Sequence, residues 1–153
     1  MQFVFTCNIN FITSHFCYGN GIDSIWSCKG IINLSTGNVY INGSNADKCG
    51  NEENTLGICV YNKNGRGVLN ENNAKGNIYI NGGSIVSVTN AAVSNYTGKT
   101  YICNGYIDGN KKGDITNRKN DGYLYYKSNV QLKYGFSSSD ANIVLDDSIT
   151  CNG

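Results

Sequence analysis

The sequence predicts an all-β fold, and three observations support this prediction. Turn-forming and strand-forming residues dominate, because Asn is abundant beside 19 Gly and 11 Tyr while Pro is absent. The better helix formers Ala, Leu, Glu and Gln are scarce, and no apolar pattern with a 3.6-residue period extends beyond two turns. Short apolar runs also recur along the chain at a nearly regular spacing.

The recurring runs define a repeat of about 20 residues, a period typical of stacked or solenoid arrays. The segment Gly37–Gly43 (GNVYING) returns almost unchanged as Gly76–Gly82 (GNIYING). Related runs start at Gly57, Lys99, Gly122 and Ala141.

Each unit is predicted to hold two short strands joined by a tight turn. Ile78–Ile80, for example, is expected to turn at Asn81–Gly83 into a second strand over Ser84–Val88. Asn-Gly pairs favour hairpins because tight hairpin turns need positive φ. We therefore expect hairpin-like repeats that form an antiparallel sandwich or hairpin array. The alternative, which the regular period favours, is a short β-solenoid whose coils stack in parallel.

The length of 153 residues predicts a single domain over residues 1–153, with the repeats at about 30–152. Residues 1–20 are interpreted as an N-terminal strand pair or a degenerate leader, because the apolar start lacks a basic region. A net charge of +1 gives no basic footprint for nucleic acid. No segment reaches the roughly 20 apolar residues that a membrane helix needs.

Cysteine usage predicts disulfides and an oxidising compartment, and hence an extracellular or cell-surface protein. Seven cysteines are spread along the chain without a CxxC pair, which argues against a zinc site or thioredoxin chemistry. Three glycosylation sequons, at Asn33, Asn42 and Asn95, weakly support this location. Because seven is odd, at least one thiol is free or pairs with another chain. The cysteines assigned to disulfides are Cys17, Cys28, Cys49, Cys59, Cys103 and Cys151, with Cys17–Cys28 and Cys49–Cys59 as local pairs.

Catalysis has little support in the sequence. His15 is the only histidine and lies in an apolar stretch, where we interpret it as structural. Asp146 and Asp147 are adjacent, so on a strand they would point to opposite faces. We therefore predict no catalytic residue, and no motif indicates a cofactor.

One stretch, Asp108–Asp114, resembles the start of an EF-hand loop, with Asp108, Asn110 and Asp114 as weak candidate ligands for calcium. Lys112 stands where a third oxygen ligand belongs, which is a strong objection to a dication site. The expected role of this stretch is an exposed loop, and no metal site is predicted.

The tyrosines give the best candidate surface. Tyr40 and Tyr79 hold equivalent places in the two matching heptads, on the strand face opposite the aliphatic residues. If the aliphatic face is the core, the rings face outward and suit sugar rings or a protein partner. Packing between neighbouring strands is the simpler explanation. The full set of candidate binding residues is Tyr40, Tyr61, Tyr79, Tyr101 and Tyr125.

The run Gly76–Ile85 (GNIYINGGSI) is similar to strand-turn units of extracellular β-solenoid carbohydrate-binding repeats. The Asn-, Tyr-, Gly- and Cys-rich style of residues 30–130 also resembles repeat modules of anaerobic gut fungal scaffoldins. That second resemblance implies cohesin-like docking of a protein partner. The short, regular cysteine repeats of such scaffoldins are not present, and no functional residue carries over.

Three function hypotheses follow. The first is a noncatalytic protein-binding or structural module of an extracellular or cell-surface assembly, whose partner is another protein or a second copy of itself. The second is a carbohydrate-binding module that uses the tyrosine row to hold a glycan. The third is a small β-solenoid polysaccharide lyase or hydrolase that depends on an acidic residue such as Asp114.

Overall fold

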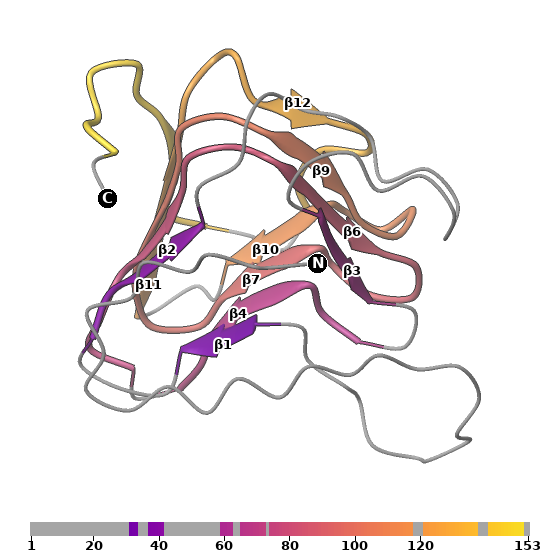
Figure 1. Cartoon of the computed structure of the whole chain (residues 1–153), viewed down its shortest axis with the longest axis horizontal. Helices are drawn as coiled ribbons and strands as arrows, with labels where there is room; N and C mark the ends of the chain where they lie inside the picture. The colour runs from indigo at the N-terminus through magenta and orange to yellow at the C-terminus, as the bar shows by residue number, and fades with distance from the viewer. Residues whose placement is uncertain are drawn as a thin grey trace.

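The computed structural model describes residues 31–33, 37–41, 59–62, 65–72, 74–117, 121–137 and 141–151. For Ile32, Cys59 and Tyr61 it describes the backbone alone. These residues form short β-strands arranged as three sheets, which enclose a common core like the three sides of a prism (Figure 1).

Within each sheet the strands lie side by side in chain order. Sheet A contains β1 (Ile31–Asn33), β4 (Val68–Asn70), β7 (Val93–Asn95) and β10 (Ile115–Asn117). Sheet B contains β2 (Val39–Ile41), β5 (Ile78–Ile80), β8 (Gly98–Ile102), β11 (Gly122–Tyr126) and β13 (Ile143–Leu145). Sheet C contains β3 (Cys59–Asn62), β6 (Ser84–Ser87), β9 (Tyr106–Asp108) and β12 (Gln131–Leu132).

The predicted antiparallel sandwich is wrong, because all pairs of these strands are parallel. The strands predicted at Ile78–Ile80 and from Ser84 onward do form, but they lie in different sheets, B and C. The turn between them is a corner of the prism, where Gly82 and Gly83 have φ values of 157° and 94°. Positive φ therefore serves a corner here as it would serve a hairpin.

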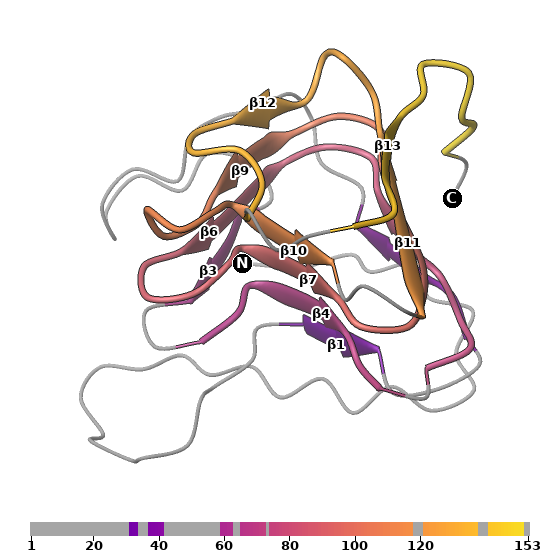
Figure 2. The same cartoon turned by 180° about the vertical axis from the view of Figure 1, so that it is seen from behind.

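The chain contributes one strand to sheet A, one to sheet B and one to sheet C, and these three strands make one coil. The next three strands form a further coil that stacks in parallel on the first (Figures 1 and 2). This is the solenoid arrangement that the regular period favours. Residues that stack on each other are 25 positions apart for Asn70 and Asn95, and 22 for Asn95 and Asn117. The repeat found in the sequence therefore corresponds to one coil of three strands, and not to one hairpin. The run that starts at Gly57 is the exception, because it contributes β3 to sheet C within the first coil.

Aliphatic rows fill the core, because inward-facing residues on neighbouring strands are in register. In sheet B one such row is Val39, Ile78, Thr100, Leu124 and Ile143. A second runs through Ile41, Ile80 and Ile102, which are fully buried. Because parallel strands run in the same direction, equivalent residues meet at the same level, and each row continues from coil to coil.

A row of asparagines lines the corner where the strands of sheet A end. Asn33, Asn70, Asn95 and Asn117 are paired in register and buried. Asn70 Nδ2 donates to Asn95 Oδ1 at 3.1 Å, and Asn95 Nδ2 donates to Asn117 Oδ1 at 2.8 Å. These amides also donate to backbone oxygens at the corner, and such partners offset the cost of burying polar atoms. We call this row the asparagine ladder.

The asparagine ladder explains why Gly122 begins β11. A Cβ at this position would lie 2.5 Å from Asn95 Nδ2 and 2.9 Å from Asn117 Oδ1. Gly122→Ala is therefore expected to lower the free energy of unfolding by about 2–3 kcal/mol, the cost of forcing an extra carbon into a packed interior. Denaturant unfolding monitored by circular dichroism measures this loss.

Gly135→Asn is the matched control, because a Cβ there meets nothing within 4 Å and Asn tolerates the φ of 79°. We expect a change under about 1 kcal/mol for the control. Equal losses for the two variants would show that the asparagine ladder does not exclude a side chain at Gly122.

Candidate functional site

The outer face of sheet B carries a row of stacked tyrosines. Strand register places Tyr40 beside Tyr79, Tyr79 beside Tyr101, and Tyr101 beside Tyr125. The ring centroids in these pairs are 4.9, 4.9 and 5.2 Å apart, and the ring planes differ by 8° to 14°. We call these four residues the tyrosine row.

The strand pattern of each coil produces the tyrosine row. An aliphatic or Thr side chain before each tyrosine points into the core, so period-2 alternation turns the ring outward. The centroid spacing matches the roughly 4.8 Å distance between neighbouring strands, which brings the rings into face-to-face contact. Four of the five tyrosines predicted from the sequence are thus brought together.

Polar groups border the rings along one side. Asn38 Nδ2 lies 3.4 Å from the hydroxyl of Tyr40, and Asn77 Nδ2 lies 3.3 Å from that of Tyr79. Partial burial raises the pKa of Tyr101 above its ordinary value, the charge of Lys99 lowers it in part, and the flanking tyrosines raise it further. The Tyr101 phenol therefore remains neutral at physiological pH, and the row is an aromatic surface with polar edges.

Tyr61 does not belong to the tyrosine row. It lies on β3 in sheet C, where its backbone pairs with Val86. The spacing of about 20 residues suggested an equivalent place, but one coil contains three strands with similar apolar patterns. Strands of different sheets therefore look alike in the sequence.

Two exposed residues on the same face were missed. Tyr123 pairs in register with Lys99, and Val144 pairs with Tyr125. Tyr123 is 45% exposed and Val144 is 40% exposed. Tyr123 could have been found from alternation, because it lies two residues before Tyr125 and so shares its face. Together with the tyrosine row, these residues form what we call the tyrosine face.

The three weak calcium candidates do not converge. Asp108 accepts a hydrogen bond from Lys133 Nζ at 2.8 Å on the outer face of sheet C. Asn110 Nδ2 donates to the backbone oxygen of Thr89, and Asn110 Oδ1 accepts from the backbone N–H of Lys112. No group of three or more His, Cys, Asp or Glu side chains suited to a metal occurs within the described ranges.

Asp114 has a structural role. Its fully buried carboxylate accepts hydrogen bonds from the backbone N–H groups of Gly109, Tyr134 and Gly135. These contacts join a loop of the third coil to the start of the fifth. A carboxylate held in this way has no access to a polysaccharide, which removes the residue named for the lyase hypothesis. His15 lies outside the described residues.

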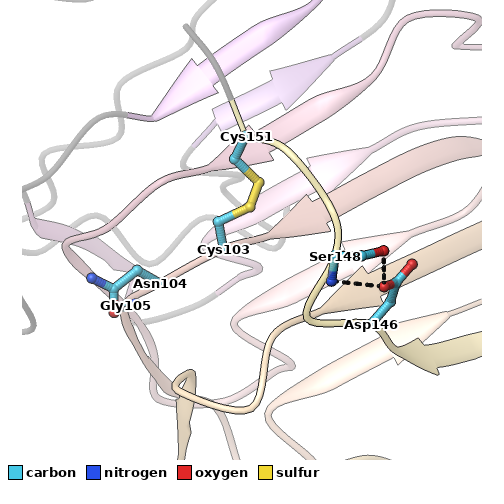
Figure 3. The surroundings of a disulfide bond; sticks show 6 residues. All are labelled: Cys103, Asn104, Gly105, Asp146, Ser148 and Cys151. Atoms are coloured by element: carbon cyan, nitrogen blue, oxygen red, sulfur yellow. Dashed lines mark hydrogen bonds between the residues drawn. A yellow bond between two sulfur atoms is a disulfide. The ribbon is translucent and has the colours of Figure 1, made fainter.

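One disulfide is present in the described part of the chain, between Cys103 and Cys151, with Cα atoms 6.1 Å apart (Figure 3). Both cysteines belong to the set predicted to form disulfides. Cys103 follows β8, so the bond ties the segment after β13 to a coil two levels below. The proposed local pairs fall on Cys17, Cys28, Cys49 and the side chain of Cys59, of which the structure gives no description.

Two of the three sequons belong to the core. Asn33 and Asn95 are members of the asparagine ladder and are buried, so neither amide is accessible for glycosylation in the folded chain. The third, at Asn42, lies outside the described residues. The Asn-x-Ser/Thr pattern at Asn33 and Asn95 therefore reflects a structural asparagine at the end of a strand.

Comparison with protein-family models, curated proteins and solved structures finds no match to this chain. None of the described residues belongs to a helix with the length and hydropathy of a membrane span. The Cys103–Cys151 pair is consistent with an oxidising compartment.

Proposed function

We propose that the chain is a noncatalytic protein-binding or structural module of an extracellular or cell-surface assembly, and that its partner contacts the tyrosine face. The single observation that carries this proposal is the face-to-face stacking of the tyrosine row. Aromatic residues, Tyr among them, are enriched at the buried centres of protein interfaces. Rings that are held by their neighbours lose little conformational entropy when a partner binds.

The stacking also favours a protein partner over a sugar. A sugar binds an aromatic residue by laying its C–H groups on the flat face of the ring. In the tyrosine row both faces of Tyr79 and of Tyr101 are covered by neighbouring rings, so only ring edges and hydroxyls face outward. At Tyr79 and Tyr101 a sugar would therefore have to rely on hydrogen bonds.

The test is capture of secreted proteins from the source by the immobilised chain, compared with the double variant Tyr101→Thr/Tyr125→Thr. Threonine keeps the preference for strands while it removes both rings. We expect loss of at least about 90% of the specifically captured protein, because aromatic anchors dominate such interfaces. The thermal midpoint should fall by only a few degrees, since each lost ring pair is worth about 1 kcal/mol.

Tyr106→Thr is the matched control, because Tyr106 is also a partly buried outward tyrosine but lies on sheet C. Capture by the control should equal that of the unmodified chain. If both variants lose the partner equally, the tyrosine face is not the contact. Retention on a polysaccharide panel that disappears in the double variant would instead establish the carbohydrate-binding alternative.

A further inference from the structure

The fifth coil of the solenoid has no strand of sheet C among the described residues. In the fifth coil, sheet A is continued by Phe136, which bridges Ile115, and sheet B is continued by β13. Sheet C ends with β12. After β13 the chain turns at Asp146 and runs to Cys151, which is bonded to Cys103 (Figure 3). No strand of the described part of the chain therefore occupies the position beyond β12.

One residue of β12 directs its backbone N–H and C=O toward this position. The N–H groups of Gln131 and Lys133 donate to the carbonyl oxygens of Gly105 and Ile107, at 2.9 and 3.2 Å. Alternate residues of a strand direct their backbone groups to opposite sides. The N–H and C=O of Leu132 therefore point away from β9, toward the side on which a further strand would lie.

Two inward-facing apolar side chains lie at this end of the core, Leu132 on the fourth coil and Leu145 on the fifth. Leu132 continues the inward row of Ile85 and Ile107, which are fully buried, but is itself only partly buried. Leu145 ends an inward row of sheet B and is 54% exposed. These side chains leave apolar surface at this end of the core, which an apolar side chain of a further strand would bury.

Charge is also placed to select a partner. On the outward face of sheet C, Val86 pairs with Asp108. Lys133 directly follows β12, and its N–H donates to Ile107 O, which places it beside Asp108 in the same row. Lys133 Nζ donates to Asp108 at 2.8 Å, and this hydrogen bond raises the pKa of the lysine. An ammonium group has three donors, so Lys133 can bind a second carboxylate from the side beyond β12.

We propose that the outer edge of β12 binds an extended segment of a partner chain, which adds as a parallel fifth strand of sheet C with an apolar residue against Leu132 and a carboxylate beside Lys133. The molecule itself supplies the pattern, because β9 presents Ile107 to Leu132 and Asp108 to Lys133 from the other side. Addition of a strand to an open sheet edge combines backbone hydrogen bonds with side-chain selection.

The test is an NMR titration of the ¹⁵N-labelled chain with a capped heptapeptide that copies residues 104–110, Asn-Gly-Tyr-Ile-Asp-Gly-Asn. We expect saturable shifts of the amide signals of Leu132 and Lys133, and about tenfold slower hydrogen exchange of the Leu132 N–H. A control peptide with Ile and Asp exchanged should cause neither change, since it reverses the apolar and acidic positions.

Exchange of the charges at Lys133 and at the aspartate of the peptide gives a second test. The variant Lys133→Glu should reject the parent peptide and bind the same peptide with lysine in place of aspartate. Absence of shifts at Leu132 in the unmodified chain, or equal shifts with the control peptide, would overturn the proposal. The readout is separate from the tyrosine face, whose own binding is monitored at Tyr101 and Tyr125, so either surface can fail without the other.

Discussion

Replacement of Asn95 by alanine is expected to lower the free energy of unfolding by about 4 kcal/mol. Asn95 Nδ2 donates to Asn117 Oδ1, and Asn95 Oδ1 accepts from Asn70 Nδ2 at 3.1 Å and Thr100 Oγ1 at 3.0 Å. Alanine removes these partners at once. Asn70 Nδ2 keeps the backbone oxygens of Gly76 and Thr97 as acceptors, but each buried polar atom left unsatisfied elsewhere costs about 1–3 kcal/mol. For a chain of this length the thermal midpoint should fall by roughly 10 °C.

Ser94→Ala is the control for this variant. Ser94 is the neighbouring residue and is equally buried, and its hydroxyl forms a hydrogen bond with Thr116 Oγ1 at 3.1 Å. We expect a loss of about 1 kcal/mol for this change. In the double variant Asn95→Ala/Asn117→Ala the losses should be far from additive, because the two amides belong to one network. If the losses in free energy of unfolding of the two single variants add up to that of the double variant, Asn95 and Asn117 stabilise the fold independently.

Removal of the Cys103–Cys151 disulfide should lower stability by a similar amount. The two cysteines are 48 positions apart, and closing a loop of this length restricts the unfolded chain by about 4 kcal/mol in the chain-entropy treatment. The double variant Cys103→Ser/Cys151→Ser tests this without leaving a reactive thiol from the pair. Urea unfolding gives the total loss, and hydrogen exchange at β13 shows where it acts.

Two other contacts hold the last segment in place. Asp146 N–H donates to Tyr126 O at 2.9 Å, and Ser128 N–H donates to Asp147 Oδ1 at 2.8 Å. If these contacts suffice, exchange at β13 will be unchanged in the double variant, contrary to our expectation. We expect instead that β13 exchanges much faster in the double variant than in the unmodified chain, because the segment after this edge strand of three residues is no longer bonded to Cys103.

Local sequence patterns identified individual strands well. Val39–Ile41 and Ile78–Ile80 were located correctly, because alternating aliphatic and tyrosine residues specify both a strand and its buried face. The same alternation placed Tyr40 and Tyr79 on the outer surface. These properties depend on the residues of one strand and its immediate neighbours.

Which strands pair with each other could not be predicted from local sequence patterns. The turn Asn81–Gly83 contains the residues of a hairpin, yet whether the chain reverses or turns a corner depends on contacts with the next coil. The asparagine ladder was missed for a related reason. Asn33 and Asn95 looked like sequons or turn residues, and their buried role emerges only when residues from different coils are stacked.

A correlation was nevertheless available in the sequence. The tripeptides Ile31–Asn33, Val68–Asn70, Val93–Asn95 and Ile115–Asn117 all begin with a β-branched residue and end with Asn, and they mark successive passages through sheet A. The same pattern also fits Val60–Asn62, Val88–Asn90 and Ile102–Asn104, which do not belong to sheet A. It therefore does not identify the coil without the structure.

The corners of the solenoid differ in length while its rows remain in register. Asn38 and Asn77 are in contact at a separation of 39 residues, whereas Asn95 and Asn117 are in contact at a separation of 22. The register between equivalent residues of neighbouring coils is therefore set by stacked side chains and not by loop length. A chain built in this way can grow by duplication of the gene segment for one coil, because each added copy meets the same residues above and below that it would itself present.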